Sequence, residues 1–461
     1  MMLAVTILAI VAMTNCQESD YEVVHISEYV RHGARTTFLD KMNYSFTQIV
    51  GQGNLTANGM RMQYLLGKQL KEQYPGIFKD KVGWDDVAIY TSSVGRAMTS
   101  AVSHLLGMFP LGVGDKITGG KKLPHRLLPP FEGLDVKFDE DDEFALPKGF
   151  NPFPFNVKTP EIDLMFLPHI TASCPNGNSY LNAKSLELHE KYNYLVSNLS
   201  KELEEAGWSA RKIYQIQNFT IEKIGHLHDE MMSYLNYYGK LPSTMTQELY
   251  HKISMIANIN LDLLYPDDTT KRLFSDGIAR AIIKNMRSFI YGSSMQKFIL
   301  YSGHDLGIYS HMLQYGMTSL ECHLRSFTDG HTEQGCESIP TYTTSFIYEL
   351  NMRDGEYFVR TLYNGKPFKI CKQDKKSHGY YCKFAEFENT IGDLLYFKGD
   401  LPTFCGNPYL ASPKSTRSEV IKSILYHRLL FIIPCIVLSI MIILTVVCRS
   451  SIEHYVKGDT P

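Results

Sequence analysis

Residues 22–35 read Glu-Val-Val-His-Ile-Ser-Glu-Tyr-Val-Arg-His-Gly-Ala-Arg. The first nine are rich in Val and Ile and predict a β-strand, which ends in a turn at Arg31 and His32. The guanidiniums of Arg31 and Arg35 flank the imidazole of His32 directly after that strand. Guanidiniums offer planar, paired donors that match the oxygens of an oxyanion. The stretch therefore predicts a strand that leads into an anion-binding turn, although a solvated basic turn would have the same composition.

Two further predicted strands end in residues of the same chemical kind. Val87 to Thr91 is followed by a loop that carries Arg96, and Phe298 to Tyr301 is followed by His304 and Asp305. In open α/β sheets, ligands bind beyond the carboxyl ends of the strands. Taken singly, Arg96 reads as a surface charge and His304 as a structural histidine. Together, the three strand ends predict one pocket that gathers three arginines, two histidines and one aspartate.

The remaining pattern indicates helices around that sheet. Thr56 is a candidate N-cap for a helix that runs to about Tyr74, and Ser275 to Phe289 is again helical. Residues 115–170 look irregular, and residues 180–265 are mostly helical. We expect an α/β fold in which a mainly parallel sheet is flanked by helices and carries an inserted, mostly helical cap. The expected boundaries are 20–115 and 270–410 for the core and 116–269 for the cap.

The composition and the two chain ends indicate a secretory-pathway membrane protein. The 461 residues are 44% hydrophobic and 20% charged with a net charge of -2, which excludes a disordered chain and predicts no nucleic-acid partner. The apolar stretch Leu3 to Met13 predicts a signal peptide at 1–16, with a buried N-terminal segment as the alternative. The uncharged run Leu429 to Cys448 predicts a transmembrane helix at 428–448 rather than a buried core helix. A stalk at 411–427 and a cytoplasmic tail at 449–461 would complete a single-pass type I protein, in a lysosome-like compartment or at the plasma membrane.

Cysteines and sequons agree with a lumenal or extracellular domain. Six cysteines, an even number, lie between the predicted signal peptide at 1–16 and the predicted transmembrane helix at 428–448, and six cysteines permit fifteen pairings. Close spacing favours Cys322–Cys336 and Cys371–Cys382, which leaves Cys174–Cys405. Candidate glycosylation sites begin at Asn43, Asn54, Asn198 and Asn218.

The motifs together resemble the signature of the histidine acid phosphatases, within the wider histidine phosphatase superfamily. The resemblance covers roughly residues 21 to 405 and rests on Arg31-His32-Gly33-Ala34-Arg35, Arg96, His304-Asp305, and weaker matches at 55–60, 174–175 and 371–384. The family's first motif usually continues to Pro where this chain has Thr37. Because that proline shapes the loop, the departure removes no reactive group.

The resemblance implies a role for each residue of the pocket. His32 would attack the phosphorus of a phosphomonoester and form a phosphohistidine. Arg31, Arg35, Arg96 and His304 would bind the phosphoryl oxygens. Asp305 would begin protonated, give its proton to the leaving alcohol and then activate water. No metal or cofactor is implied, a working pH of about 4 to 6 follows from the ordinary pKa values of Asp and His, and a homodimer is left open.

Three other functions remain open at this stage. A phosphoglycerate mutase-like transferase shares the His and Arg framework, but the His304-Asp305 pair argues against it. An inositol-polyphosphate (phytase-like) phosphatase shares both motifs. A membrane receptor on a catalytically retired phosphatase fold would be expected to have lost one of the six groups, and all six are present.

Overall fold

The computed structural model describes the chain except for residues 1–20, 79–82, 84, 118–143, 372–378 and 411–461. The predicted signal peptide, stalk, transmembrane helix and tail therefore lie outside the described residues. Within the described part, no helix is both long and apolar enough to cross a membrane.

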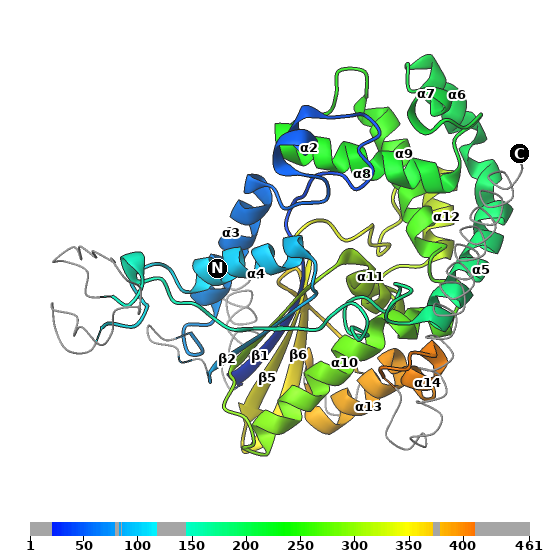
Figure 1. The fold of residues 1–461 in the computed structure, drawn as a ribbon. Coiled ribbons are helices and arrows are strands. Elements are labelled where there is room, and N and C mark those ends of the chain that lie inside the picture. Colours follow the sequence, from blue (N-terminus) through cyan, green and yellow to red (C-terminus); the bar gives the residue numbers. More distant parts are fainter. Residues whose placement is uncertain (1–20, 79–82, 84, 118–143, 372–378, 411–461) are drawn as a thin grey trace, which may run out of the picture.

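A single eight-stranded sheet forms the centre of the described chain (Figure 1). Its strands are β1 (Glu22–Arg31), β2 (Val87–Thr91), β3 (Phe155–Val157), β4 (Phe298–Gly303), β5 (Ser345–Arg353), β6 (Glu356–Tyr363), β7 (Lys366–Phe368) and β8 (Tyr381–Lys383). The spatial order is β3-β2-β4-β1-β5-β6-β7, and β8 pairs with β6 off this path. The three strands that were predicted to precede the motif residues are β1, β2 and β4, and they lie next to one another.

The sheet is mixed, so the prediction of a mainly parallel sheet was wrong. The pairs β1–β4, β2–β4 and β2–β3 are parallel, whereas β1–β5, β5–β6, β6–β7 and β6–β8 are antiparallel. β5 and β6 are joined by Asp354 and Gly355, which both have positive φ. A two-residue turn of this kind closes an antiparallel hairpin, whereas parallel strands need a long crossover.

Helices cover both faces of the sheet. On one face lie α3 (Ala57–Gln73) and α4 (Gly95–Met108), and on the other lie α10 (Asp268–Ile290), α11 (Asp305–Gln314) and α13 (Phe384–Leu395) (Figure 1). Ile26 and Val30 of β1 pack with the first set, and Tyr29 between them packs with the second. β1 is therefore buried on both faces, and its polar residues His25, Ser27 and Glu28 are fully buried as well.

The first residues of two helices are determined by capping residues in the local sequence. Thr56 caps α3 as predicted, because its side chain accepts a hydrogen bond from the amide of Gly59. α10 begins at Asp268, earlier than the expected Ser275, because Asp267 and Thr270 form a reciprocal capping box.

The predicted helical stretch between the motifs is also helical in the structure. It comprises α5 (Pro175–Tyr192), α6 (Ser197–Glu205), α7 (Ala210–Tyr214), α8 (Ile221–Tyr238) and α9 (Gln247–Asp262). Leu203, Ile224 and Ile253 belong to a separate hydrophobic cluster of these helices. Figure 1 shows α8 and α9 with α2 (Ser45–Val50), above the sheet and on the side to which the chain leaves β1.

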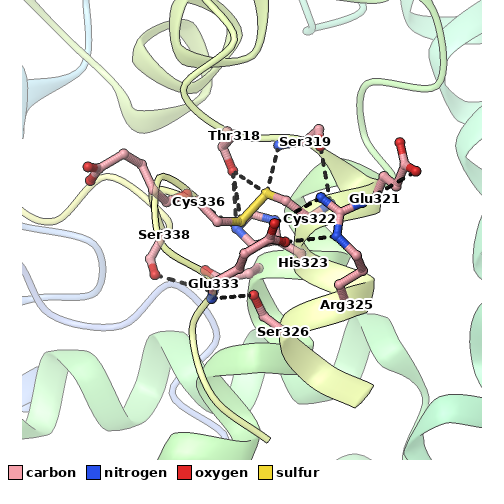
Figure 2. The surroundings of a disulfide bond; sticks show 12 residues. Thr318, Ser319, Glu321, Cys322, His323, Arg325, Ser326, Glu333, Cys336 and Ser338 are labelled. Carbon is pink, nitrogen blue, oxygen red and sulfur yellow. Dashed lines mark hydrogen bonds and ion pairs between the residues drawn. A yellow bond between two sulfur atoms is a disulfide. The ribbon is translucent and has the colours of Figure 1, made fainter. Parts of the chain in front are cut away.

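These six cysteines form the two disulfides that close spacing favoured and the one pair that was left over. Cys174–Cys405 joins the start of α5 to α14 (Leu401–Cys405), and Cys371–Cys382 closes a short loop. Cys322–Cys336 connects α12 (Leu320–Asp329) to the chain that follows it, with Thr318 and His323 at its side (Figure 2). The four sequon asparagines, Asn43, Asn54, Asn198 and Asn218, are all exposed.

Candidate active site

The site is assembled at the carboxyl ends of three adjacent parallel strands. Arg31 at the end of β1 is in register with Gly303 at the end of β4, and β2 lies on the other side of β4. The side chains that follow these ends meet: the rings of His32 and His304 are 5.6 Å apart, and Arg96 Nη2 is 3.4 Å from His304 Nδ1. All six residues that the sequence singled out lie in this one region.

His32 is held with one ring nitrogen available. Its Nδ1 lies 2.9 Å from the carbonyl oxygen of Gly33, which can only accept, so Nδ1 carries the proton and Nε2 keeps its lone pair. Burial and the charges of Arg31 and Arg96 hold the pKa of His32 well below 6.5. His32 is therefore a neutral imidazole whose free nitrogen can act as a nucleophile. The turn needs Gly33, because a Cβ there would lie 2.2 Å from the carbonyl oxygen of Gly59.

Arg31 is fixed from several sides. Its Nη2 lies 2.6 Å from Asp305 Oδ2, its Nη1 donates to the carbonyl of Pro340, and its guanidinium stacks on the ring of Tyr342. The backbone carbonyl of Arg31 accepts from Gln63. Since the side chain is 1% exposed, these contacts leave it little freedom to move.

Arg35 makes a two-pronged ion pair with an acid of the helical segment. Its Nη2 and Nη1 lie 2.6 and 3.1 Å from the carboxylate oxygens of Asp229 in α8. The ring of Phe38 covers Arg35 at 3.6 Å and also contacts Arg96 at 4.6 Å. The side chain of Phe38 is 43% exposed, so it forms part of the rim of the site.

His304 is fixed in one tautomer. A guanidinium can only donate, so His304 Nδ1 accepts from Arg96 and His304 Nε2 donates to Ser92 Oγ at 2.8 Å. Burial and the charge of Arg96 hold the pKa of His304 well below 6.5. At rest this residue is a neutral imidazole, although an ordinary histidine would be charged over most of the expected working range of about pH 4 to 6.

Asp305 also differs from its expected resting state. Burial would raise the pKa of its carboxyl, but the charges of Arg31 and Arg35 prevail and lower that pKa to about 2. The residue was expected to begin as a protonated acid at a pH of about 4 to 6. The free site instead holds a carboxylate that is paired with Arg31.

The site retains hydrogen-bond donors without partners. Nε of Arg31, Nε of Arg35 and Nε of Arg96 are buried and make no hydrogen bond within the described structure. Buried donors are nearly always satisfied in folded proteins, and an unsatisfied one points to a missing partner. Three such donors on three cations indicate a site for an oxyanion.

Potential metal ligands group elsewhere. Among the described residues, the groups of suitable side chains are Cys322–His323–Cys336 and Cys371–Cys382–Glu386. Both contain two cysteines that are paired in a disulfide. Neither group includes a residue of the candidate active site.

Sequence reasoning missed four residues that shape the site. Asp229, Phe38, Ser92 and Tyr342 contact the arginines or His304. Ser92 stood in the loop that carries Arg96 and could have been included. Nothing in the sequence links Asp229 to Arg35, which lies 194 positions away.

Comparison with known proteins gives consistent results. Residues 16–364 match the family model of the histidine phosphatase superfamily (branch 2). Prostatic acid phosphatase of Bos taurus is 22% identical over 357 residues, which cover 75% of this chain and 78% of that protein. Lysosomal acid phosphatase of Homo sapiens is 22% identical over 260 residues, which cover 55% of this chain and 53% of that protein.

The fold is similar to solved phytase structures. The phytase from D. castellii has a TM-score of 0.55 at 14% identity and covers 86% of each chain. The Hafnia alvei phytase in complex with myo-inositol hexakis sulphate has a TM-score of 0.52 at 12% identity, over 82% of this chain and 98% of that one. The match over most of the chain confirms the prediction of a phosphatase of the histidine acid phosphatase family. This chain belongs to the histidine phosphatase superfamily (branch 2).

Proposed function

We propose that this chain hydrolyses phosphate monoesters through a phosphohistidine on His32. The observation that supports this most strongly is the state of that residue: a neutral imidazole with Nδ1 bound to the Gly33 carbonyl and Nε2 free, among three guanidiniums with unpaired donors. Such a nucleophile can form an N–P bond while the guanidiniums bind the phosphoryl oxygens. Arg31, Arg35 and Arg96 would offset the charge that develops in the transition state. His304 was expected to bind a phosphoryl oxygen too, but both of its ring nitrogens have protein partners, so it would instead hold Arg96 in place.

The first chemical step breaks the ester bond. Nε2 of His32 bonds to phosphorus as the P–O bond to the leaving group breaks, and Asp305 protonates the departing oxygen. In the second step water attacks phosphorus, the N–P bond breaks, and the carboxylate of Asp305 takes the proton of the water. Asp305 then passes this proton to the departing phosphate, which leaves as the monoanion, and the residue is again the carboxylate that pairs with Arg31.

The proton for Asp305 comes with the substrate. A phosphate monoester has a second pKa of about 6, so below that pH it arrives as a monoanion with one P–OH proton. Because the phosphoryl group competes with Asp305 for Arg31, binding weakens the ion pair that keeps this carboxyl ionised. Transfer of the P–OH proton to Asp305 then converts this residue into the protonated general acid. Because only the monoanion carries that proton, activity should be highest at acid pH.

The direct test is the His32→Ala variant assayed with p-nitrophenyl phosphate at about pH 5, where the monoanion dominates. We expect a loss of at least about a thousandfold, as is typical when a nucleophile is removed. Substantial retained activity in a folded variant would contradict the assignment.

A second candidate substrate class is inositol polyphosphates, because the structural neighbours include phytases. The rim of the site carries the aromatic ring of Phe38 and the carboxylate of Asp229. These groups favour substrates with few charges. Comparing rates on inositol hexakisphosphate and on simple monoesters separates the two classes.

The location is proposed from the relatives and the chain ends. The similar prostatic and lysosomal acid phosphatases favour a lysosomal or secreted protein. The apolar stretches at 1–16 and 428–448 favour secretion and membrane anchoring. Fractionation of cells that express the full chain, with carbonate and detergent extraction, tests whether the protein is anchored. Deglycosylation of the same material tests the four sequons.

A further inference from the structure

We infer that Asp229 limits the phosphate site to one net positive charge and so selects the monoanion of the phosphate ester. The inference rests on the proposed function of the site and adds a specificity-determining residue that lies outside the chemistry. Asp229 would act through Arg35 and is therefore a positioning residue rather than a catalytic one.

The contacts of Asp229 fix its carboxylate in the site. Two of its bonds go to Arg35, at 2.6 and 3.1 Å, and Oδ2 also accepts weaker bonds from Thr37 Oγ1 and the amide of Phe38, both at 3.4 Å. Arg35 is 2% exposed and Asp229 is 21% exposed, so the pair is largely screened from solvent. Both terminal nitrogens of Arg35 face Asp229, and the unpaired Nε is what remains for a ligand.

The charged groups of the site come close to cancelling. Arg31 pairs with Asp305 and Arg35 pairs with Asp229, whereas Arg96 has no carboxylate partner among the described residues. His304 Nδ1 accepts from Arg96 and so carries no proton, and burial and the arginines hold the pKa values of His32 and His304 well below 6.5, which favours neutral rings. One positive charge is left over.

The other titratable groups around Asp229 do not change this count. They are His226, His228, Glu230 and Tyr214. Burial lowers the pKa of both histidines, that of His228 to about 4, and raises the pKa of Glu230 to about 7 and that of Tyr214 above its ordinary value. Burial thus biases each of these groups toward its neutral form at acid pH. The carboxyl of Asp229 behaves in the opposite way, since Arg35 overcomes burial and lowers its pKa.

A site with one net positive charge matches a phosphate monoanion. A dianion would leave one uncompensated negative charge among buried groups, which is costly in a medium of low dielectric constant. The monoanion is neutralised, and it brings the proton that Asp305 needs. A site without Asp229 would carry two net positive charges and would accept the dianion.

The experiment uses two tetrahedral oxyanions as competitive inhibitors of p-nitrophenyl phosphate hydrolysis by the full-length chain. At about pH 5, inorganic phosphate is a monoanion and sulfate is a dianion of similar size. The wild type is expected to bind phosphate at least about tenfold more tightly than sulfate, the effect of one unit charge a few ångströms away. Asp229→Asn, which keeps the shape and one acceptor, is expected to reduce that ratio by about tenfold and to extend activity to higher pH.

The matched control is Glu222→Gln, on the same helix. Glu222 is 54% exposed and pairs with Lys223 at the surface, so this variant removes one negative charge from α8 away from the site. It is expected to leave the ratio unchanged. If Asp229 only held the loop in place, Asp229→Asn would weaken both inhibitors equally, and that result would overturn the inference.

The wild type alone provides a second measurement if Asp229→Asn does not fold. Phosphate inhibition is expected to weaken as the pH rises and the monoanion is lost, while sulfate stays a weak inhibitor throughout. Phosphate that binds more tightly as the dianion, or sulfate that binds as well as phosphate at about pH 5, would contradict the inference. Neither result would touch the proposed role of His32, which the His32→Ala assay tests separately.

Discussion

Two clusters of the same composition are connected to α11, and their difference shows where chemistry can occur. Each contains a carboxylate, an imidazole and a hydroxyl. These are Asp305, His304 and Ser92 in the candidate active site, and Asp262, His323 and Thr318 in the second cluster. His323 and Thr318 lie beside the Cys322–Cys336 disulfide (Figure 2). The second cluster has the arrangement of a hydrolase triad. Nδ1 of His323 lies 2.6 Å from Asp262 Oδ2, and Nε2 lies 3.1 Å from Thr318 Oγ1.

The second cluster is nevertheless closed, in the sense that its polar atoms are paired with one another and with neighbouring protein groups. The other carboxylate oxygen of Asp262 accepts from Tyr309 of α11, and His323 Nε2 also lies 3.2 Å from the carbonyl of Glu337. Asp262, His323 and Thr318 are all under 5% exposed. No donor or acceptor of this network is left for a substrate, so we assign it a structural role.

The active-site cluster, in contrast, has polar atoms without partners within the protein. Three buried arginine Nε–H groups have no partner in the described structure, and one nitrogen of His32 is free. Asp305 is 27% exposed, so solvent reaches it. Unsatisfied polar atoms next to an accessible acid therefore distinguish this site from a triad-like network that only supports the fold.

The largest predicted contrast is in the catalytic activity of variants at the two aspartates, Asp305 and Asp262. Asp305→Asn should lower kcat about a hundredfold or more on an alkyl phosphate, the usual contribution of a general acid. Because p-nitrophenol leaves without protonation, the loss on p-nitrophenyl phosphate should be smaller. Asp262→Asn should change neither rate by more than about twofold, since it lies in the closed network. Equal losses of Asp305→Asn on both substrates would contradict the acid role.

For stability, we expect the substitution of Asp262 to have a larger effect than that of Asp305. Asp262→Ala should lower the free energy of unfolding by about 3 kcal/mol, because it leaves His323 and Tyr309 buried without a partner. Urea denaturation of the purified domain, followed by far-UV circular dichroism, measures this change. An unaltered midpoint would show that the closed network does not support the fold.

Glu230 provides an intermediate case, since it is buried beside Asp229. Its carboxylate accepts from the amides of Met42, at 3.3 Å, and Lys41, and from the hydroxyl of Tyr214 at 3.5 Å. Burial raises its pKa to about 7, above that of the unfolded chain. The stability associated with its protonated form is therefore present below about pH 4 and is lost as the pH rises through about 7. Glu230→Gln should remove this pH dependence and stabilise the protein by about 2 kcal/mol at about pH 8. Melting curves of both proteins across this range measure the effect, and parallel pH profiles would contradict it.

The smallest contrast is between the two hydroxyls. Thr318→Val should cost about 1 kcal/mol of stability, the net value of one buried hydrogen bond, and leave kcat/KM unchanged. Ser92→Ala should lower kcat/KM about tenfold by freeing the ring of His304, with a smaller change in stability. Thermal melting and steady-state kinetics on both variants are needed, and the same pattern in the two variants would remove the distinction.

The sequence predicted the parts of the site that depend on strand order alone. β1, β2 and β4 could be recognised by their apolar runs, and parallel neighbours bring their carboxyl ends to one edge. The hairpin of β5 and β6 was missed, although Asp354-Gly355 between apolar runs is a readable turn signal. Asp229 could not have been placed, because its contact with Arg35 depends on how α8 lies over the loop after β1. The charge state of Asp305 likewise depended on a distance that only the fold provides.

The central claim is that His32 becomes phosphorylated during turnover. The measurement is a rapid alkaline quench of the Asp305→Asn variant during hydrolysis of p-nitrophenyl phosphate, followed by mass spectrometry of the peptide that contains residues 22–35. This variant should accumulate the phosphoenzyme, because no carboxylate activates the attacking water. We predict one phosphoryl group on His32, and a phosphoryl group on another residue, or none during continued turnover, would contradict the account.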